Sequence, residues 1–405
     1  MRVPAFLLLL ELTLSACALV PDRRPLPVAL KDEATILGIR YARFFADEMP
    51  ELWARRFREW TKEEAAKRLP ALFGRPHYYL AISGGSLNGA FGAGLLKGWT
   101  EHGDRPEFSI VTGISTGALI APFAFLGPEY DPVLEEIYTR YGTKDIFIFR
   151  PLVEAFFSDS VIGTRKFERL IARYITDEVV ARIAEEHRRG RRLWIGTTDL
   201  DTARPVLWDI GRIAASGKPG ARALIQKVLK ASASIPSVFP PVYFEFEVNG
   251  RRYDEIHVDG GATSQVFLYP VAVDWRRVLE ALEVPGKPEV YIIRNSRLTP
   301  PARPINPADL FTIAQRTVNA LVRTQGIGDL YAIYYVVTRD GLNYNLAYIP
   351  DSFELEPEEP FDRDYMRRLF AFGYRLGREG YRWHHLPPGI QEEQERILES
   401  ASMAF

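Results

Sequence analysis

The chain has 405 residues, 47% of them hydrophobic, which is enough to bury one large core or two ordinary ones. Its 51 Lys and Arg nearly balance its 52 Asp and Glu. The resulting formal charge of −1 excludes a general electrostatic attraction to nucleic acid. The single cysteine, Cys17, excludes an internal disulfide framework and a thiolate cluster for a metal ion.

Residues 1–16 have the pattern of a bacterial lipoprotein signal peptide. Arg2 precedes an apolar run that ends in Leu14-Ser15-Ala16-Cys17, which resembles a lipobox. In a lipobox the cysteine thiol accepts a diacylglyceryl group and becomes the mature N-terminus. An ordinary secretory signal and an N-terminal membrane anchor are the alternatives.

A lipidated Cys17 would hold the protein on a membrane, because each buried acyl CH₂ contributes about 0.8 kcal/mol. Glu11 departs from the pattern, since a carboxylate weakens insertion of the apolar segment. The residue after the cysteine is Ala18 and not Asp. Under the sorting rule of enteric bacteria, this favours the periplasmic face of the outer membrane. No later run of about 20 uncharged apolar residues predicts a membrane-spanning helix.

The segment after the cysteine predicts a tether and then helices. Residues 17–34 combine several prolines with mixed charges, as in a lipidated tether. Over 35–75 apolar residues recur at helical spacing, and Pro50 is expected to divide two helices. Arginines lie between them, so this helical segment either rests on a membrane surface or, as we favour, packs on the main domain.

Two strand-to-helix units follow. Residues 78–82 predict a buried strand that runs through a glycine-rich loop into a helix over 90–99, and a strand at 108–112 leads into a helix over 118–126. Further strands are expected at 193–198, 206–210 and 290–294, and further helices at 221–231 and 308–321. This alternation predicts an α/β fold with a mainly parallel sheet and helices on both faces.

Two later segments differ from this alternation. Residues 245–248 and 251–254 predict a hairpin with a type I′ turn at Asn249-Gly250. Residues 330–337 have helical spacing, but their β-branched content leaves helix and strand open. The end of the chain, 389–405, predicts a charged tail.

A serine lies where a strand gives way to an apolar helix, in Gly113-Ile114-Ser115-Thr116-Gly117. The glycines remove the Cβ atoms that would crowd a sharp turn, so Ser115 can present its hydroxyl at the apex. The helix N-terminus behind it would favour the negative charge that develops in acyl transfer. This pattern predicts a nucleophilic serine.

Three further blocks have features that acyl transfer needs. Gly84 and Gly85 lie in a strand-to-helix loop whose amides can converge on one oxygen as an oxyanion hole. Asp259 ends a short strand and is followed by Gly260 and Gly261, which expose its carboxylate. The small residues of Ala231-Ser232-Ala233-Ser234-Ile235-Pro236 allow close backbone packing near such a site.

These four blocks, in this order, resemble the patatin-like phospholipase family. The resemblance covers motifs from about residue 76 to 300, and it implies a patatin-like three-layer hydrolase domain over 76–388. It implies that Ser115 is the nucleophile and Asp259 its general base in a two-residue dyad. The oxyanion donors would be Gly84, Gly85 and Ser86. The motif glycines that support these groups are Gly89, Gly113, Gly117, Gly260 and Gly261.

The chain departs from the family pattern at two positions of the first block. Ser86 replaces the usual third glycine, although its amide can still donate. Asn88 stands where the family often has Arg or Lys, which removes a positive charge near the oxyanion. Asn88 can donate a hydrogen bond there or cap the helix that follows.

There are two rival interpretations of the site, a catalytic histidine and a nucleotide-binding glycine loop. A Ser-Asp-His triad would use His384 or His385, near the C-terminus. His257 shares the strand face of Asp259 and is expected to be structural, while His77, His102 and His187 are expected at the surface. The glycines after the first strand fit neither a dinucleotide fingerprint nor a P-loop.

The sequence therefore predicts a serine acyl hydrolase that acts on membrane phospholipid or lysophospholipid and needs no metal or organic cofactor. It would be lipid-anchored in a bacterial cell envelope, without a nucleic-acid partner; the oligomeric state is not predicted. The alternative is a catalytically silent lipoprotein that binds or transfers lipid with the same fold.

Overall fold

The computed structural model describes residues 23–50, 60–146, 148–149, 162–236, 238–299, 304 and 310–390. The predicted signal peptide, Cys17, the stretch after Pro50 and most of the predicted tail lie outside these residues.

The centre of the molecule is a sheet in the order β13-β12-β4-β5-β8, with every neighbouring pair parallel. These strands are β4 (Tyr78–Ile82), β5 (Ile110–Ile114), β8 (Arg192–Asp199), β12 (Glu289–Arg294) and β13 (Asn343–Tyr348). Because their carboxyl ends meet at one edge, the loops after β4 and β5 are neighbours.

Antiparallel strands extend the sheet beyond β8. They are β11 (Arg251–Asp259), β10 (Val242–Val248), β1 (Thr35–Ile36) and β2 (Ile39–Arg40), while β9 (Arg204–Asp209) pairs with both β8 and β3 (Arg43–Phe45). A two-stranded sheet joins β6 (Ile148–Phe149) to β7 (Ile162–Gly163).

Side chains of β4 alternate between two hydrophobic cores. Leu80 and Ile82 belong to one core and Tyr79 and Ala81 to the other, as expected for a strand buried on both faces. The first core is formed with α4 (Gly89–His102), α5 (Thr116–Leu126), α6 (Asp131–Arg140), α9 (Arg165–Tyr174), α10 (Asp177–Arg189), α11 (Ile210–Ala215), α12 (Ala221–Ser232) and α15 (Arg363–Arg378).

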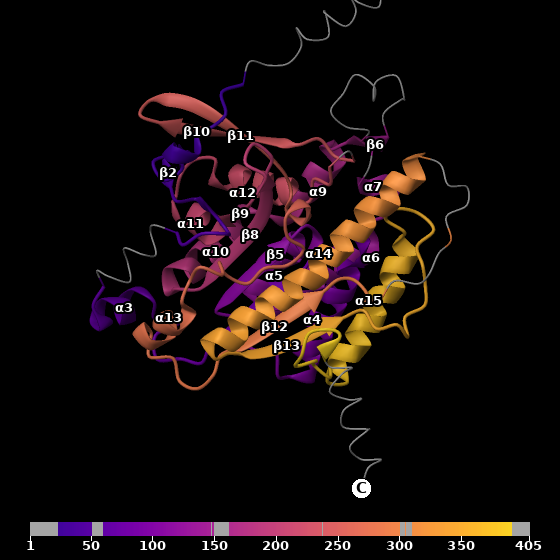
Figure 1. The fold of residues 1–405 in the computed structure, drawn as a ribbon. Helices are drawn as coiled ribbons and strands as arrows, with labels where there is room; N and C mark the ends of the chain where they lie inside the picture. Colours follow the sequence, from indigo (N-terminus) through magenta and orange to yellow (C-terminus); the bar gives the residue numbers. More distant parts are fainter. Residues whose placement is uncertain are drawn as a thin grey trace, which may run out of the picture.

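The opposite face is covered by α3 (Lys62–Arg68), α13 (Trp275–Ala281) and α14 (Leu310–Asp340), and Figure 1 shows α14 crossing the sheet. A short helix, α7 (Thr143–Ile146), completes the α-helices named here. The predicted α/β fold, with a mainly parallel central sheet between helical layers, is confirmed. Within the described ranges, no helix is both long and apolar enough to span a bilayer.

Glycines bring α4 and α15 into backbone contact. A Cβ atom on Gly94 would lie 2.1 Å from the carbonyl oxygen of Phe370, and one on Gly98 would lie 2.1 Å from that of Tyr374. Real side-chain atoms do not approach so closely, so only glycine permits this spacing. The contact matters for the site because α4 begins at the end of the loop after β4.

The predicted helical segment over 35–75 is wrong for residues 35–45, which form β1, β2 and β3. Leu37 and Gly38 have φ angles of 53° and 71°, so the chain turns tightly and pairs β1 with β2. Pairing at the sheet edge overrides the helical spacing of the apolar residues. The only helix of this segment among the described residues is α3.

The predicted tether over 17–34 is also wrong from Arg23 onward. Arg23 forms an ion pair of 2.7 Å with Asp201, and the amide of Leu26 donates to the Asp254 carbonyl at 3.0 Å. Leu26 is buried. The prolines here therefore shape a segment that packs against β11.

Candidate active site

The serine turn has the strained geometry that its glycines predict. Ser115 lies between β5 and α5 with φ 55° and ψ −123°, a backbone conformation uncommon for a non-glycine residue. Its amide donates to the Ser232 hydroxyl at 3.0 Å, and that hydroxyl donates to the Gly196 carbonyl at 2.7 Å. The end of α12 and strand β8 thus hold the turn in place.

Close backbone contacts explain the two glycines of the turn. A Cβ on Gly113 would lie 2.4 Å from the Gly117 carbonyl oxygen, and one on Gly117 would lie 2.3 Å from the Ile82 carbonyl oxygen. Neither position has room for a side chain. The turn is therefore packed directly on the end of β4.

The structure brings Asp259 to Ser115 across 144 residues of sequence. Asp259 is the last residue of β11 and pairs with Thr197 of β8, the neighbour of β5. Its carboxylate accepts from the Gly261 amide at 2.8 Å. Burial raises the pKa of Asp259 to about 6, while hydrogen bonds from the Ser115 side chain and the Gly261 amide oppose the rise.

Both groups are shielded from water, with Ser115 8% and Asp259 5% exposed. Gly260 provides the close approach of this loop, because a Cβ there would lie 2.7 Å from the Gly196 carbonyl oxygen. Gly260 and Gly261 therefore have different structural roles. Gly260 allows the loop to pack on β8, and the amide of Gly261 donates to the Asp259 carboxylate.

The loop after β4 differs from the predicted oxyanion hole at one residue. The amide of Gly84 donates to the Gln265 carbonyl at 2.9 Å, so it is already used. Gly84 acts as a spacer instead, because a Cβ on it would lie 3.3 Å from the Ser115 Cβ. The amides of Gly85 and Ser86 have no acceptor within the described part of the chain.

Asn295, which directly follows β12, holds this loop and was not predicted from the sequence. Its amide donates to the Ser83 hydroxyl at 2.8 Å, its side chain donates to the Ser83 carbonyl at 2.9 Å, and its side-chain oxygen accepts from Gly92. A Cβ on Gly85 would lie 2.2 Å from the Asn295 carbonyl oxygen, and Gly85 has φ 152°. Glycine is thus required at residue 85 by both contact and conformation.

The two remaining residues of this block also have defined contacts. Asn88 precedes α4, but its side chain does not cap the helix; its oxygen accepts from the Tyr365 hydroxyl at 2.8 Å. The interpretation of Asn88 as a helix cap is therefore wrong. A Cβ on Gly89 would lie 2.1 Å from the Thr116 hydroxyl, so this glycine lets α4 pack against the serine turn.

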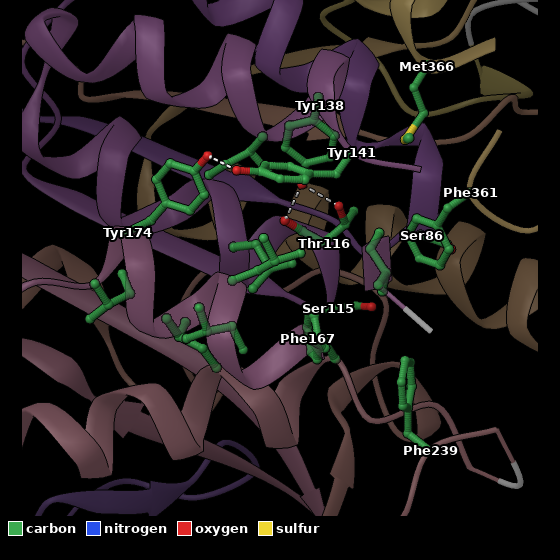
Figure 2. Close-up of a pocket in the computed structure, with 18 of the residues that line it drawn as sticks. Ser86, Ser115, Thr116, Tyr138, Tyr141, Phe167, Tyr174, Phe239, Phe361 and Met366 are labelled. Atoms are coloured by element: carbon green, nitrogen blue, oxygen red, sulfur yellow. Dashed lines mark hydrogen bonds between the residues drawn. The ribbon is translucent and has the colours of Figure 1, made fainter. Parts of the chain in front are cut away.

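An apolar cavity opens beside the serine. Its walls come from α5, α6, α9 and α12, and Figure 2 shows Ser115 between Tyr138 on one side and Phe239 on the other. Four hydroxyls of the wall bond in pairs, Tyr138 to Thr116 and Tyr141 to Tyr174, the latter at 2.7 Å. The cavity therefore presents a mainly apolar surface to a ligand. Leu119, Phe123, Ile137, Phe167, Ile171 and Phe361 are among its lining residues.

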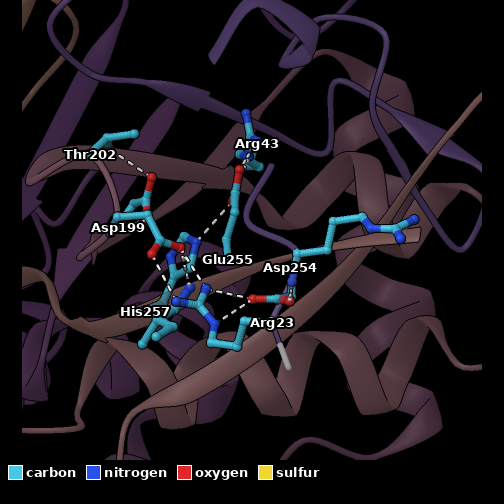
Figure 3. Close-up of polar contacts among 10 residues, drawn as sticks. Arg23, Arg43, Asp199, Thr202, Asp254, Glu255 and His257 are labelled. Atoms are coloured by element: carbon cyan, nitrogen blue, oxygen red, sulfur yellow. Dashed lines mark hydrogen bonds and ion pairs between the residues drawn. The ribbon is translucent and has the colours of Figure 1, made fainter. Parts of the chain in front are cut away.

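The histidines do not assemble a triad. His257 is fully buried, and its ring bonds to Thr197 at 2.8 Å and to Glu255 at 3.1 Å, which in turn pairs with Arg43 (Figure 3). These contacts make it structural. His384 and His385 lie against Tyr348 and Tyr344 of β13, three strands away from β5.

The surface prediction fails for two other histidines. His77 is only 2% exposed and bonds to the Tyr79 hydroxyl and the Leu72 carbonyl. His187 is half-buried beside Asp209. Among the described residues, no three His, Cys, Asp or Glu side chains lie together as a metal site would require.

Comparisons with known proteins agree with the motifs. The model of the family described as patatin-like phospholipase matches residues 80–272, which contain all four blocks. Patatin-16 of Solanum tuberosum is 26% identical over 219 residues, covering 50% of this chain and 54% of patatin-16. Uncharacterized protein R571 of Acanthamoeba polyphaga mimivirus is 27% identical over 199 residues, covering 48% of this chain and 60% of R571.

The chain spans about half the length of the curated patatins it matches. Among solved structures, the crystal structure of VipD from Legionella pneumophila is 14% identical, with a TM-score of 0.32 over 75% of this chain and 66% of that one. The family match lies on the same residues that build the serine turn, the glycine loop and the Asp259 loop. Residues 80–272, just under half of this chain, thus match the patatin-like phospholipase family.

Proposed function

We propose that the protein is a serine acyl hydrolase that releases fatty acid from lipid esters. The observation that carries the proposal is the convergence of Ser115, Asp259 and two amides without acceptors in the described chain beside an apolar cavity. The match to the patatin-like phospholipase family supports a lipid substrate.

In the proposed reaction, Asp259 accepts the hydroxyl proton as Ser115 Oγ attacks the ester carbonyl. The amides of Gly85 and Ser86 bind the oxyanion. The tetrahedral intermediate collapses to an acyl-enzyme, and the proton on Asp259 passes to the departing alcohol. Water then gives its proton to Asp259 and attacks the acyl carbonyl, which releases the fatty acid and returns the proton to Ser115.

The environment of Asp259 suits this reaction. A carboxylate of ordinary pKa is a weak base toward a serine hydroxyl, and burial that raises the pKa to about 6 makes it stronger while leaving it ionised at neutral pH. The apolar cavity would hold the acyl chain, because its lining is mostly apolar and four of its hydroxyls are bonded in pairs.

We further propose that Cys17 is lipidated and holds the enzyme at the periplasmic face of the outer membrane. The argument is the lipobox-like sequence before Cys17 and Ala18 after it. Anchoring would raise the local concentration of membrane phospholipid or lysophospholipid at the active site.

A fluorophosphonate probe tests the proposal, because it labels only an activated serine. The full chain is labelled beside its Ser115→Ala variant. We expect labelling that disappears in the variant. A folded wild-type protein that takes no label would support the alternative, a silent lipid-binding protein of the same fold.

A further inference from the structure

One buried arginine has no hydrogen-bond partner among the residues that the structure describes. Arg294, the last residue of β12, is 3% exposed, and its guanidinium makes no hydrogen bond or ion pair in the described chain. Arg191 is equally buried, yet it donates to the carbonyls of Phe108 and Phe125 and pairs with Glu186. Burying an unpaired charge lowers the stability of the fold, so a functional role for Arg294 is worth considering.

Neighbouring charges compensate Arg294 only in part, and none of them bonds to its guanidinium in the described chain. Asp329 is the acidic group that acts on it through space, but the Asp329 carboxylate accepts the amides of Gln265 and Val266 at 2.6 and 3.3 Å. Burial lowers the pKa of Arg294 to about 10, and the positive charge of Arg323 acts in the same direction. The Nε of Arg294 is therefore buried without an acceptor among the described residues, in a side chain that burial leaves poorly solvated.

Arg294 faces a polar cavity of about 470 Å³. Three other arginines and one carboxylate line it: Arg297, Arg316, Arg323 and Glu356. Arg297 pairs with Glu356 at 3.3 Å, and Arg323 donates to the Leu298 carbonyl. Among the described residues that line the cavity, positive charges therefore outnumber negative ones, and an anion is the ligand that this wall favours.

The cavity lies against the catalytic loop. Ser83, Gly84, Gly85 and Asn88 form its other wall, and the position of a Cβ on Gly84 is 3.3 Å from the Ser115 Cβ. The apolar cavity is lined by Ser86 of the same loop and by Ser115. The scissile ester would thus lie between an apolar cavity and a cationic one.

We infer that the cationic cavity binds the phosphate of a glycerophospholipid substrate, with Arg294 as its main ligand. The inference rests on the proposed hydrolase function. A glycerophospholipid carries an acyl chain, an ester and a phosphodiester in this order, a few bonds apart. Asn88 lines the same cavity but is uncharged. The positive charge that would bind the phosphate is that of Arg294 on β12. A planar guanidinium can donate two hydrogen bonds to one phosphate.

The kinetic test compares dihexanoylphosphatidylcholine with dihexanoylglycerol, both as monomers in solution. These substrates share their esters and acyl chains and differ in the phosphocholine group, whose phosphate is the part that an arginine can bind. We expect wild-type enzyme to prefer the phospholipid. In Arg294→Met the ratio of the two kcat/KM values should fall by about tenfold or more, the loss of one charge-assisted hydrogen bond, mainly through the phospholipid KM.

Arg212→Met is the matched control, because the Nε of Arg212 is likewise buried without a hydrogen bond but lies on α11, away from both cavities. It should keep the wild-type ratio. Arg294→Lys retains the charge without the planar fork and should give an intermediate ratio. An unchanged ratio in Arg294→Met would overturn the inference.

A binding test needs no turnover. In Ser115→Ala, glycerol 3-phosphate should raise the melting temperature, and Arg294→Met should abolish this shift. Without phosphate, Arg294→Met should melt no lower than its parent, because it removes an unpaired buried charge. A shift that inorganic phosphate produces but glycerol 3-phosphate does not would indicate a free-phosphate site and contradict the inference.

The wild-type results separate the two proposals. Hydrolysis of neither substrate would contradict the hydrolase, while the glycerol 3-phosphate titration would still decide whether Arg294 binds phosphate. Equal kcat/KM values for both substrates would contradict the phosphate site and leave the hydrolase standing.

Discussion

Asp259 is buried, and its carboxylate is hydrogen-bonded to the side chain of Ser115. Desolvation is the largest influence on its pKa, and the bonds from Ser115 and Gly261 only partly offset it. A single residue therefore sets the pH range in which the proposed reaction can begin.

The first prediction concerns the pH dependence of activity. Asp259 must be ionised to accept the Ser115 proton, so kcat/KM should rise with pH through a midpoint near 6. The measurement is hydrolysis of a soluble short-chain ester between pH 4.5 and 8, choices that bracket this value. A profile that is flat across this range would mean that Asp259 is not the base.

The second prediction concerns stability. The pKa of Asp259 is about 6 when folded and about 3.9 when unfolded, so the protonated carboxyl favours folding below pH 4 and this contribution is lost as pH rises through 6. Asp259→Asn has no such loss. It should melt higher than wild type at pH 8, and the difference should vanish near pH 4; a lower melting temperature at pH 8 would contradict the burial argument.

At this scale the sequence predicted that Ser115 and Asp259 lie together, but it did not predict every hydrogen-bond partner of the site. Ser115, Asp259 and the motif glycines could be identified as site residues from their residue types and their local spacing. Gly84 was predicted to be an oxyanion donor, but its amide donates to the carbonyl of Gln265, which lies 181 residues later in the sequence. Arg294 ends an ordinary buried strand and Asn295 follows it, and only strand pairing places these two residues beside the loop.

Elements were predictable where local pattern and tertiary environment agree. The predicted strand at 78–82 coincides with β4, and Asn249 and Gly250 form the predicted turn with φ angles of 50° and 76°. Residues 330–337, left open between helix and strand, lie inside α14. Residues 35–45 were mistaken for a helix because their strands exist only through pairing with β9 and β10.

The third prediction tests the contact between α4 and α15. In Gly98→Ala the new Cβ would meet backbone atoms of Tyr374 and Arg378, which cannot move aside cheaply. Overpacking of this kind costs about 1–3 kcal/mol or more, which exceeds the gain in helix propensity of about 1 kcal/mol. The free energy of unfolding, measured by denaturant titration, should fall.

Gly328→Ala is the control for this change. Gly328 is exposed within α14, and nothing lies within 4 Å of its added Cβ. The same substitution there should raise stability by about 1 kcal/mol through helix propensity alone. Equal effects at Gly98 and Gly328 would show that the two helices do not depend on the glycine contact.

The whole molecule places one reactive loop between an apolar and a cationic cavity, on a sheet whose parallel strands end at that loop. The α/β class could be predicted because alternating strands and helices favour this arrangement. The two cavities could not, because their walls come from helices and strands that the sequence separates by more than a hundred residues.

The fourth prediction concerns attachment to the membrane. If Cys17 carries acyl chains, Cys17→Ala should move the protein from the membrane to the soluble fraction, because the anchor that contributes about 0.8 kcal/mol per CH₂ is lost. Fractionation after expression in a Gram-negative host measures this, with a high-salt wash to remove peripheral binding. A processed variant that stays in the membrane would exclude the lipobox.

The most direct test of the central claim is release of fatty acid from phospholipid by wild type, Ser115→Ala and Ser216→Ala, the last being a serine at the end of α11 outside the site. The account predicts release by wild type and Ser216→Ala, and a loss of at least about a thousandfold in Ser115→Ala with its fold intact. Equal release by all three proteins would contradict it.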